Sequence, residues 1–210
     1  MPGLLITCEG IDGSGKTSFI PSIQNHFEKK GYTVVITREP GGTELAEKLR
    51  AMLLHQEMSP ITEAMLMFAA RRDHVEKVIA PALAEGKAVI SDRFVDSSYA
   101  YQHGGKDVSL HTMSLLEEIS LTMPSGRIVP DLTLWFDLEP EVARERRRVV
   151  REPDRFESKE TDFFERVQAT YANRFWESPD RIQRIDASLD REHVAHQVDE
   201  KLLTFLAKWP

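Results

Sequence analysis

The hydrophobic and polar positions of this chain follow two alternating patterns. Five short segments are apolar over most of their length, at residues 4–8, 33–37, 87–91, 132–138 and, more weakly, 181–186. Between them, helical spacing recurs at residues 17–30, 44–54, 61–85 (with a bend or an end expected near Pro81), 110–121, 141–149, 162–176 and 193–206. Buried strands that alternate with helices predict a parallel sheet with right-handed crossovers. We therefore expect one α/β domain over residues 1–210, with a five-stranded parallel sheet and helices on both faces.

The first apolar segment leads directly into a phosphate-binding motif. The eight residues match G-x-x-x-x-G-K-[ST] at every fixed position, as Gly10-Ile11-Asp12-Gly13-Ser14-Gly15-Lys16-Thr17. Glycines let the backbone N–H groups turn toward an anion, and the N-terminus of the following helix adds positive potential. Lys16 would reach the outer phosphates, and the Thr17 hydroxyl would bind Mg²⁺. The motif predicts a nucleoside triphosphate site in a P-loop NTPase fold.

Two further polar segments also come directly after predicted strands. The loop Arg38-Glu39-Pro40-Gly41-Gly42-Thr43 follows the second strand, and Asp92-Arg93 ends the third. Ligands of parallel sheets bind at the carboxyl ends of the strands, so these segments should meet the phosphate loop. Asp92 is expected to hold Mg²⁺ and Arg93 to bind a second phosphate, and a salt bridge between the two is the less favoured alternative.

The segment Phe68-Ala69-Ala70-Arg71-Arg72 places an aromatic ring and two arginines on successive helical positions. Residues three or four apart share a helix face, so Phe68 can pair with Arg71 or Arg72. Stacking and charge together would suit a flat base that carries a phosphate. A buried phenylalanine beside solvated arginines is, however, the more common meaning of this pattern.

Charge and cysteine content narrow the class of protein further. With 27 basic and 34 acidic residues the net charge is −7, which argues against a general nucleic-acid binder. The single cysteine, Cys8, cannot form a disulfide within the chain. No signal peptide and no apolar run of about 20 residues is evident. The expectation is a cytoplasmic protein that binds neither nucleic acid nor membranes.

Taken together, the motifs resemble those of the bacterial thymidylate kinases, in the same order and over nearly the whole chain. Besides the phosphate loop and Asp92-Arg93, they are Thr37-Arg38-Glu39-Pro40-Gly41-Gly42-Thr43, Phe68-Ala69-Ala70-Arg71, Ser97-Ser98-Tyr99-Ala100-Tyr101-Gln102, Pro130-Asp131-Leu132-Thr133-Leu134 and Asp154-Arg155-Phe156-Glu157. The resemblance implies a kinase that phosphorylates dTMP to dTDP with Mg²⁺ and ATP, for dTTP synthesis. It also implies a homodimer and an arginine-rich lid at about residues 144–157.

The resemblance further implies roles for individual residues. Lys16, Asp12, Arg93 and one of the lid arginines, Arg148 or Arg151, would act in phosphoryl transfer. Arg146 and Ala187 would lie on the ATP side, together with the phosphate loop. The residues expected to bind dTMP are Glu39, Pro40, Arg50, Met67, Phe68, Arg71, Arg93, Ser98, Tyr101 and Gln102. Tyr101 would exclude a ribose 2′-hydroxyl, and Ser98, Gln102 and Arg71 would hydrogen-bond the thymine.

Three positions depart from the family pattern. Met67 stands where relatives often carry the aromatic residue that stacks on the base, and we expect the neighbouring Phe68 to stack instead. Phe94 follows Asp92-Arg93 where many relatives have tyrosine or histidine, and Val150 replaces a lid arginine of some relatives. A GTPase switch is excluded because an Asn-Lys-x-Asp motif is absent: the only asparagines, Asn25 and Asn173, precede His26 and Arg174.

Overall fold

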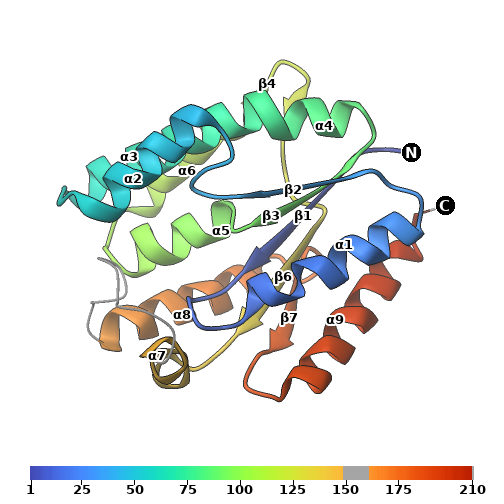
Figure 1. Ribbon diagram of the computed structural model, residues 1–210. Coiled ribbons are helices and arrows are strands. Elements are labelled where there is room, and N and C mark those ends of the chain that lie inside the picture. The colour runs from blue at the N-terminus through green and yellow to red at the C-terminus, as the bar shows by residue number, and fades with distance from the viewer. Residues whose placement is uncertain (149–160, 210) are drawn as a thin grey trace.

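The computed structural model describes residues 1–148 and 161–209, with the side chains of residues 147, 148 and 161 left out. Within these residues, five parallel strands form one sheet in the order β2-β3-β1-β6-β7 (Figure 1). All five apolar segments predicted as strands are confirmed, and they form β1 (Leu4–Glu9), β2 (Val34–Arg38), β3 (Ala88–Asp92), β6 (Leu132–Asp137) and β7 (Ile182–Asp186).

The helices begin and end close to the predicted positions. They are α1 (Ile20–Lys29), α2 (Glu44–His55), α3 (Pro60–His74), α6 (Leu110–Leu121), α7 (Pro140–Arg148), α8 (Thr161–Glu177) and α9 (Arg191–Leu206). Side-chain oxygens at the N-caps accept backbone N–H bonds in the first turns of several, namely Thr43, Ser59, Ser109 and Asp190. None of the helices in the described ranges has both the length and the apolar character needed to cross a membrane.

Two local details differ from the prediction. The first helix does not start as an α-helix at Thr17, because Lys16–Phe19 form a tighter 3₁₀ turn (η1) that keeps the phosphate loop compact. The third helical segment is interrupted before Pro81, by a π-helical stretch at Val75–Ile79 (η2), and continues as α4 (Ala80–Ala84). Pro81 lies in the first turn of α4, where a missing N–H costs little.

Some elements were not predicted at all. Residues 95–104 form a short helix, α5 (Val95–Ser98), followed by a π-helical stretch, η3 (Tyr99–Gly104). A two-stranded hairpin, β4 (Thr122–Met123) with β5 (Gly126–Arg127), follows α6. The hairpin strands are only two residues long, so neither could show the alternation that marks a strand.

Helices cover both faces of the sheet (Figure 1), and alternate side chains of the central strand β1 belong to two separate core clusters. Leu4 and Ile6 point to the layer that α1 and α9 cover, and both side chains are fully buried. Leu5 points to the opposite layer, where it packs in one cluster with buried residues of α3, α4, α5 and α6. Burial on both faces explains why these strands read as continuous apolar runs.

The strand register brings the functional segments into one row. Cys8 at the end of β1 lies opposite Asp92 of β3, and Asp92 lies opposite Arg38 of β2. Because the strands are parallel, the phosphate loop, Asp92-Arg93 and the loop after Arg38 all leave the sheet at the same edge. The predicted convergence of these segments is therefore confirmed.

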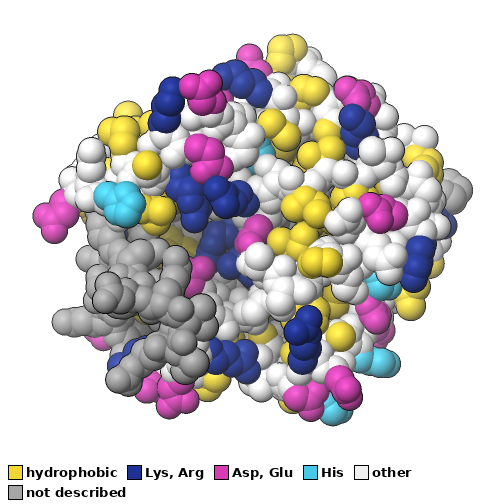
Figure 2. Space-filling view, viewed as in Figure 1, with side chains coloured by type: hydrophobic (Ala, Val, Ile, Leu, Met, Phe, Trp, Pro, Cys, Tyr) yellow, Lys and Arg dark blue, Asp and Glu magenta, His cyan; other side chains and the backbone are white. Residues whose placement is uncertain are grey.

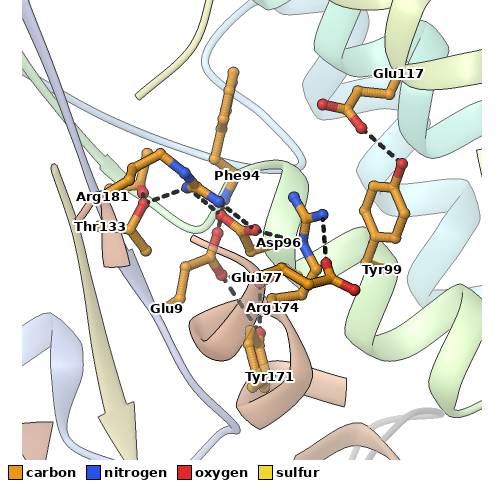
Figure 3. A network of polar contacts seen from close by, with 12 residues as sticks. Glu9, Phe94, Asp96, Tyr99, Glu117, Thr133, Tyr171, Arg174, Glu177 and Arg181 are labelled. Atoms are coloured by element: carbon orange, nitrogen blue, oxygen red, sulfur yellow. Dashed lines mark hydrogen bonds and ion pairs between the residues drawn. The ribbon is translucent and has the colours of Figure 1, made fainter. Parts of the chain in front are cut away.

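A buried ionic cluster ties this edge to the C-terminal half of the chain (Figure 3). Asp96 of α5 is 1% exposed and accepts hydrogen bonds from Arg174 of α8 (2.9 Å) and Arg181 (2.7 Å). Arg181 also donates to Thr133 of β6 (2.8 Å). Burial alone would raise the pKa of Asp96, but the two guanidinium groups hold it below its ordinary value. Three elements that are distant in sequence are thus joined beside the site.

Candidate active site

The phosphate loop has the backbone that its glycines predict. Gly10 has a φ of +139°, and a Cβ there would lie 2.5 Å from the Phe136 carbonyl oxygen, so only glycine fits. The Lys16 side chain is buried, and its Nζ lies 3.7 Å from Asp12 Oδ1 and 3.5 Å from Asp92 Oδ1. The lysine is thereby held at the mouth of the loop, between two carboxylates.

Thr17 and Asp92 have the geometry expected of a magnesium site. Thr17 Oγ1 donates to Asp92 Oδ2 over 2.6 Å, so a strand-end carboxylate and the motif hydroxyl are adjacent. The other oxygen, Asp92 Oδ1, is buried and has no hydrogen-bond partner in the described part of the chain. The described residues contain no group of three or more His, Cys, Asp or Glu side chains that could hold a metal ion. Mg²⁺ commonly takes one or two protein ligands plus waters and substrate phosphates, so this donor set fits it.

Arg93 connects the phosphate loop to the rest of the site. It has a left-handed backbone, with a φ of +72°. Its guanidinium donates to Asp12 (2.8 Å), Ser97 (2.9 Å) and Tyr171 (3.2 Å). Burial opposes its charge, but the Asp12 carboxylate more than offsets this and raises the pKa of Arg93 well above its ordinary value. The salt bridge that Arg93 forms is with Asp12 and not with its neighbour Asp92.

Glu9, which the sequence analysis missed, holds the turn after Arg93 in place (Figure 3). It is fully buried and accepts hydrogen bonds from the Phe94 backbone N–H (2.8 Å) and from the Ser97 hydroxyl. Burial raises the pKa of Glu9 to about 7, and the nearby charge of Asp96 adds to the effect. The available signal was a carboxylate at the end of a buried strand, directly before the phosphate loop.

A pocket opens beside Arg93, and Lys16 is not among the residues that line it. On the face shown in Figure 2, basic side chains gather beside a hollow. Asp12 and nine of the ten residues predicted to bind dTMP line the pocket, these nine being Glu39, Pro40, Arg50, Met67, Arg71, Arg93, Ser98, Tyr101 and Gln102. A pocket that holds several cationic and polar groups together with apolar side chains can bind a small anionic ligand with a flat apolar part.

Phe68 is the predicted residue that does not line this pocket. It is 2% exposed and packs in the core layer below, under the Arg71 guanidinium, whose Cζ lies 4.8 Å from the ring centroid. The predicted pairing of Phe68 with Arg71 is therefore confirmed. Met67 lines the pocket instead, which favours it over Phe68 as the side chain that contacts a bound base.

Arg71 presents one unused hydrogen-bond donor. Its Nε donates to Glu39 Oε2 (2.7 Å) and its Nη2 to Ser98 Oγ (2.9 Å). Nη1 is buried and has no partner among residues 1–148 and 161–209. A buried unpaired N–H is costly, so this donor marks a position where a ligand oxygen would be stabilised.

His74 secures the loop that carries Glu39. Its Nδ1 lies 2.9 Å from Glu39 Oε1, and its Nε2 lies 2.6 Å from Thr37 Oγ1. The loop passes so close that a Cβ on Gly42 would lie 2.5 Å from His74 Nε2. Glu39 is thus fixed by Arg71 and His74 together. Sequence reasoning missed His74, which looks like any histidine near a helix end.

The remaining predicted residues are only partly placed. Arg50 Nη1 donates to the Pro40 carbonyl (3.0 Å), and burial lowers its pKa, with the charges of Arg38 and Arg93 adding to the effect. Tyr101 stacks below the guanidinium of Arg93, whose Cζ lies 5.1 Å from its ring centroid. On the other side of the phosphate loop, Arg146 donates to the Ala187 carbonyl over 3.0 Å. The side chain of Arg148 and all of Arg151 lie outside the described residues.

These contacts outline two candidate anion sites, and the Asp12–Arg93 pair lies where they meet. One is formed by the phosphate loop with Lys16, and the other by the part of the pocket that Arg50 and Arg93 line. On a P-loop fold, this arrangement is that of an ATP-dependent nucleoside monophosphate kinase, and it places the chain in this class.

Comparisons with known proteins identify the family within this class. The family model described as Thymidylate kinase matches residues 8–198. The thymidylate kinase of Verminephrobacter eiseniae is 47% identical over 207 residues, 96% of this chain and 92% of that one. The thymidylate kinase of Nitrosospira multiformis is 46% identical over 209 residues, 99% and 100% of the two chains. The crystal structure of thymidylate kinase from Ehrlichia chaffeensis has a TM-score of 0.77 and 29% identity, and covers 96% of this chain and 99% of that chain.

The chain belongs to the thymidylate kinase family. It is an ATP-dependent kinase of nucleotide biosynthesis that phosphorylates dTMP to dTDP, as the motifs of its sequence predict.

Proposed function

We propose that the two candidate anion sites perform this reaction by direct transfer of the γ-phosphoryl group of ATP to the 5′-phosphate of dTMP. The observation that carries the proposal is the position of Arg93, which pairs with Asp12 of the phosphate loop and also lines the pocket. An arginine at that junction would contact the acceptor phosphate and the transferring group together. ATP would occupy the phosphate loop, with Arg146 and Ala187 on its outer side.

The reaction needs positive charge and alignment rather than a general base. A phosphate monoester has a second pKa near ~6, so the acceptor oxygen is already largely anionic at pH 7. The barrier lies in bringing two anions together, and Lys16, Arg93 and Arg50 supply the opposing charge. When bound, Mg²⁺ would neutralise phosphate oxygens, and Thr17 and Asp92 are the residues to hold it.

The pocket supports a thymine nucleotide in several ways. Arg71 Nη1 offers a buried donor, which suits a base carbonyl oxygen. Met67 contributes a polarizable apolar contact for the base, and Ser98 and Gln102 contribute polar groups. Tyr101, held against Arg93, would occupy the space of a ribose 2′-hydroxyl and so favour deoxyribose.

Metal removal tests the assignment of Thr17 and Asp92. We expect EDTA to abolish ADP formation from ATP and dTMP, and added Mg²⁺ to restore it. Thr17→Val should need a higher Mg²⁺ concentration for half-maximal turnover, whereas Thr204→Val, on the exposed face of α9, should not. An unchanged Mg²⁺ requirement in Thr17→Val would contradict the assignment of Thr17.

We also propose a homodimer that forms through α3 and α6. These packed helices expose large apolar side chains at i, i+4 spacing, Ile61 with Met65 (56% exposed) on α3 and Leu115 with Ile119 (69% exposed) on α6. Exposed apolar side chains gathered on neighbouring helices are typical of an interface. Light scattering should give twice the chain mass of 24.0 kDa, and Met65→Glu combined with Ile119→Glu should give monomers. A monomeric parent protein would contradict the proposal.

The single domain over residues 1–210, the lid at about residues 144–157 with Arg148 or Arg151 acting in transfer, and the cytoplasmic location stay predictions from the sequence.

A further inference from the structure

A buried ion pair lies behind the predicted base pocket. Glu63 of α3 is fully buried, and its carboxylate pairs with the ammonium group of Lys106, whose side chain is 12% exposed. The other carboxylate oxygen accepts a hydrogen bond from Gln102 Nε2 (3.1 Å). Neither Glu63 nor Lys106 lines the pocket, but Gln102 does. The pair therefore reaches the pocket through one residue.

The hydrogen-bonding chemistry of Lys106, Glu63 and Gln102 allows only one orientation of the Gln102 side-chain amide. An ammonium group only donates hydrogen bonds, and a carboxylate that is paired with it only accepts them. The side-chain amide of Gln102 must therefore turn its nitrogen toward Glu63. Its carbonyl oxygen, Oε1, is then the end of the planar amide that is left over, and it has no hydrogen-bond partner among the residues that the structure describes.

We propose that Glu63 is a positioning residue for base selection, which acts by making Gln102 present an acceptor to the base. The proposal rests on the assignment of Gln102 to the base pocket. Thymine has an imide N3–H that donates to such an oxygen. Cytosine has an unprotonated N3 and an amino group in place of the O4 carbonyl, so it would set an acceptor against Gln102 Oε1 and a donor against Arg71 Nη1.

The substitution Glu63→Gln should reverse the orientation of the Gln102 side-chain amide. Lys106 would still donate, so it would take the carbonyl oxygen of the new amide. The amide nitrogen at position 63 would then face Gln102, which would turn its carbonyl inward and its NH₂ toward the pocket. The expected result is a fall of about tenfold or more in the ratio of kcat/KM for dTMP to kcat/KM for dCMP, mostly through a higher KM for dTMP.

Two companion variants separate positioning from general damage. Glu63→Asp keeps a group that only accepts, so it should retain most of the selectivity. Glu44→Gln removes an exposed carboxylate that also pairs with a lysine, Lys48, and should leave the ratio unchanged. Should Glu63→Gln not fold, Glu63→Leu with Lys106→Met removes both charges together, a change that buried pairs often tolerate. This double variant releases the Gln102 amide and should also lower the ratio.

Gln102→Leu distinguishes this proposal from the base-pocket assignment. A KM for dTMP that is unaffected by Gln102→Leu would show that Gln102 does not contact the base. The base-pocket assignment of Gln102 and the positioning role of Glu63 would then both be wrong. A raised KM in Gln102→Leu, with a folded Glu63→Gln (or the double variant) that keeps the parent ratio within twofold, would overturn the role of Glu63 alone. A lowered ratio in Glu63→Gln, together with a ratio close to that of the parent protein in Glu63→Asp, would support the role of Glu63.

Discussion

Replacement of Arg93 by alanine is expected to lower turnover by about 10³–10⁵-fold, the range measured for arginines that stabilise phosphoryl transfer in other enzymes. The guanidinium is the group that pairs with Asp12 of the phosphate loop while lining the acceptor pocket. Its removal leaves the repulsion between the two nucleotides uncompensated at the point where they meet. Steady-state assays of ADP formation with saturating ATP and dTMP would measure the fall in turnover.

The fold should survive this change. Alanine also carries a Cβ, so the left-handed φ of +72° at position 93 costs about as much as it does for arginine. Circular dichroism should be unchanged, and ATP should still bind to the phosphate loop. Arg127→Ala, which removes an exposed arginine paired with Glu117 and Glu118, is the matched control and should turn over normally. Turnover in Arg93→Ala within tenfold of the parent protein would refute the role of Arg93.

Replacement of Asp96 by asparagine is expected to lower the free energy of unfolding by about 3–5 kcal/mol, the typical cost of breaking a buried ionic contact from one side. Arg174 and Arg181 would lose their shared partner, and α5, α8 and the residue just before β7 would lose the contact that joins them. Urea denaturation monitored by tryptophan fluorescence would measure the change. Asp162→Asn, an exposed carboxylate on α8, should change it by less than about 0.5 kcal/mol.

The same cluster gives the stability of the protein a pH dependence. The pKa of Asp96 is lower in the folded state, so its contribution is present above the ordinary value of 3.8 and is lost as the pH falls through the folded value. The pKa shift of Glu9, and so its effect on stability as the pH changes, has the opposite sign. Its pKa is raised from 4.5 to about 7, so its contribution is full below 4.5 and declines as the pH rises through 7. Asp96→Asn should therefore be less sensitive to acid than the parent protein, and a parallel acid-unfolding curve would contradict this explanation.

The strands and the long helices could be predicted because their signal is local. Buried strands such as Leu4–Glu9 read as apolar runs, and the helix at Leu110–Leu121 has its bounds marked by an N-cap serine and a change of spacing. Residues 95–104 lack such a signal. Polar residues in that segment, such as Ser97, Ser98 and Gln102, are buried because they bind side chains from distant elements, and no local period reports this.

The same contrast between local signals and distant contacts decides which site residues could be predicted. Lys16 and Asp92 belong to contiguous motifs at strand ends, so a single sequence shows both the residue and its direction. Glu9, Glu63 and His74 act through partners between 35 and 162 positions away, and are recognisable only once the chain is folded. Phe68 and Met67 show a second reason why site residues are hard to predict from sequence. A shift of one position on a helix turns a side chain by about 100°, which decides between core and pocket.

The row formed by Cys8, Asp92 and Arg38 across three adjacent strands has a consequence for changes in chain length. Residues added to a surface connection such as the hairpin at 122–127 leave that row intact, so the spacing between phosphoryl donor and acceptor should be insensitive to them. A single residue inserted within β1 or β3 would instead shift one half of the site by about 3.3 Å against the other and turn its side chains to the opposite face. We therefore expect this fold to tolerate grafted loops at peripheral connections but not insertions within the central strands.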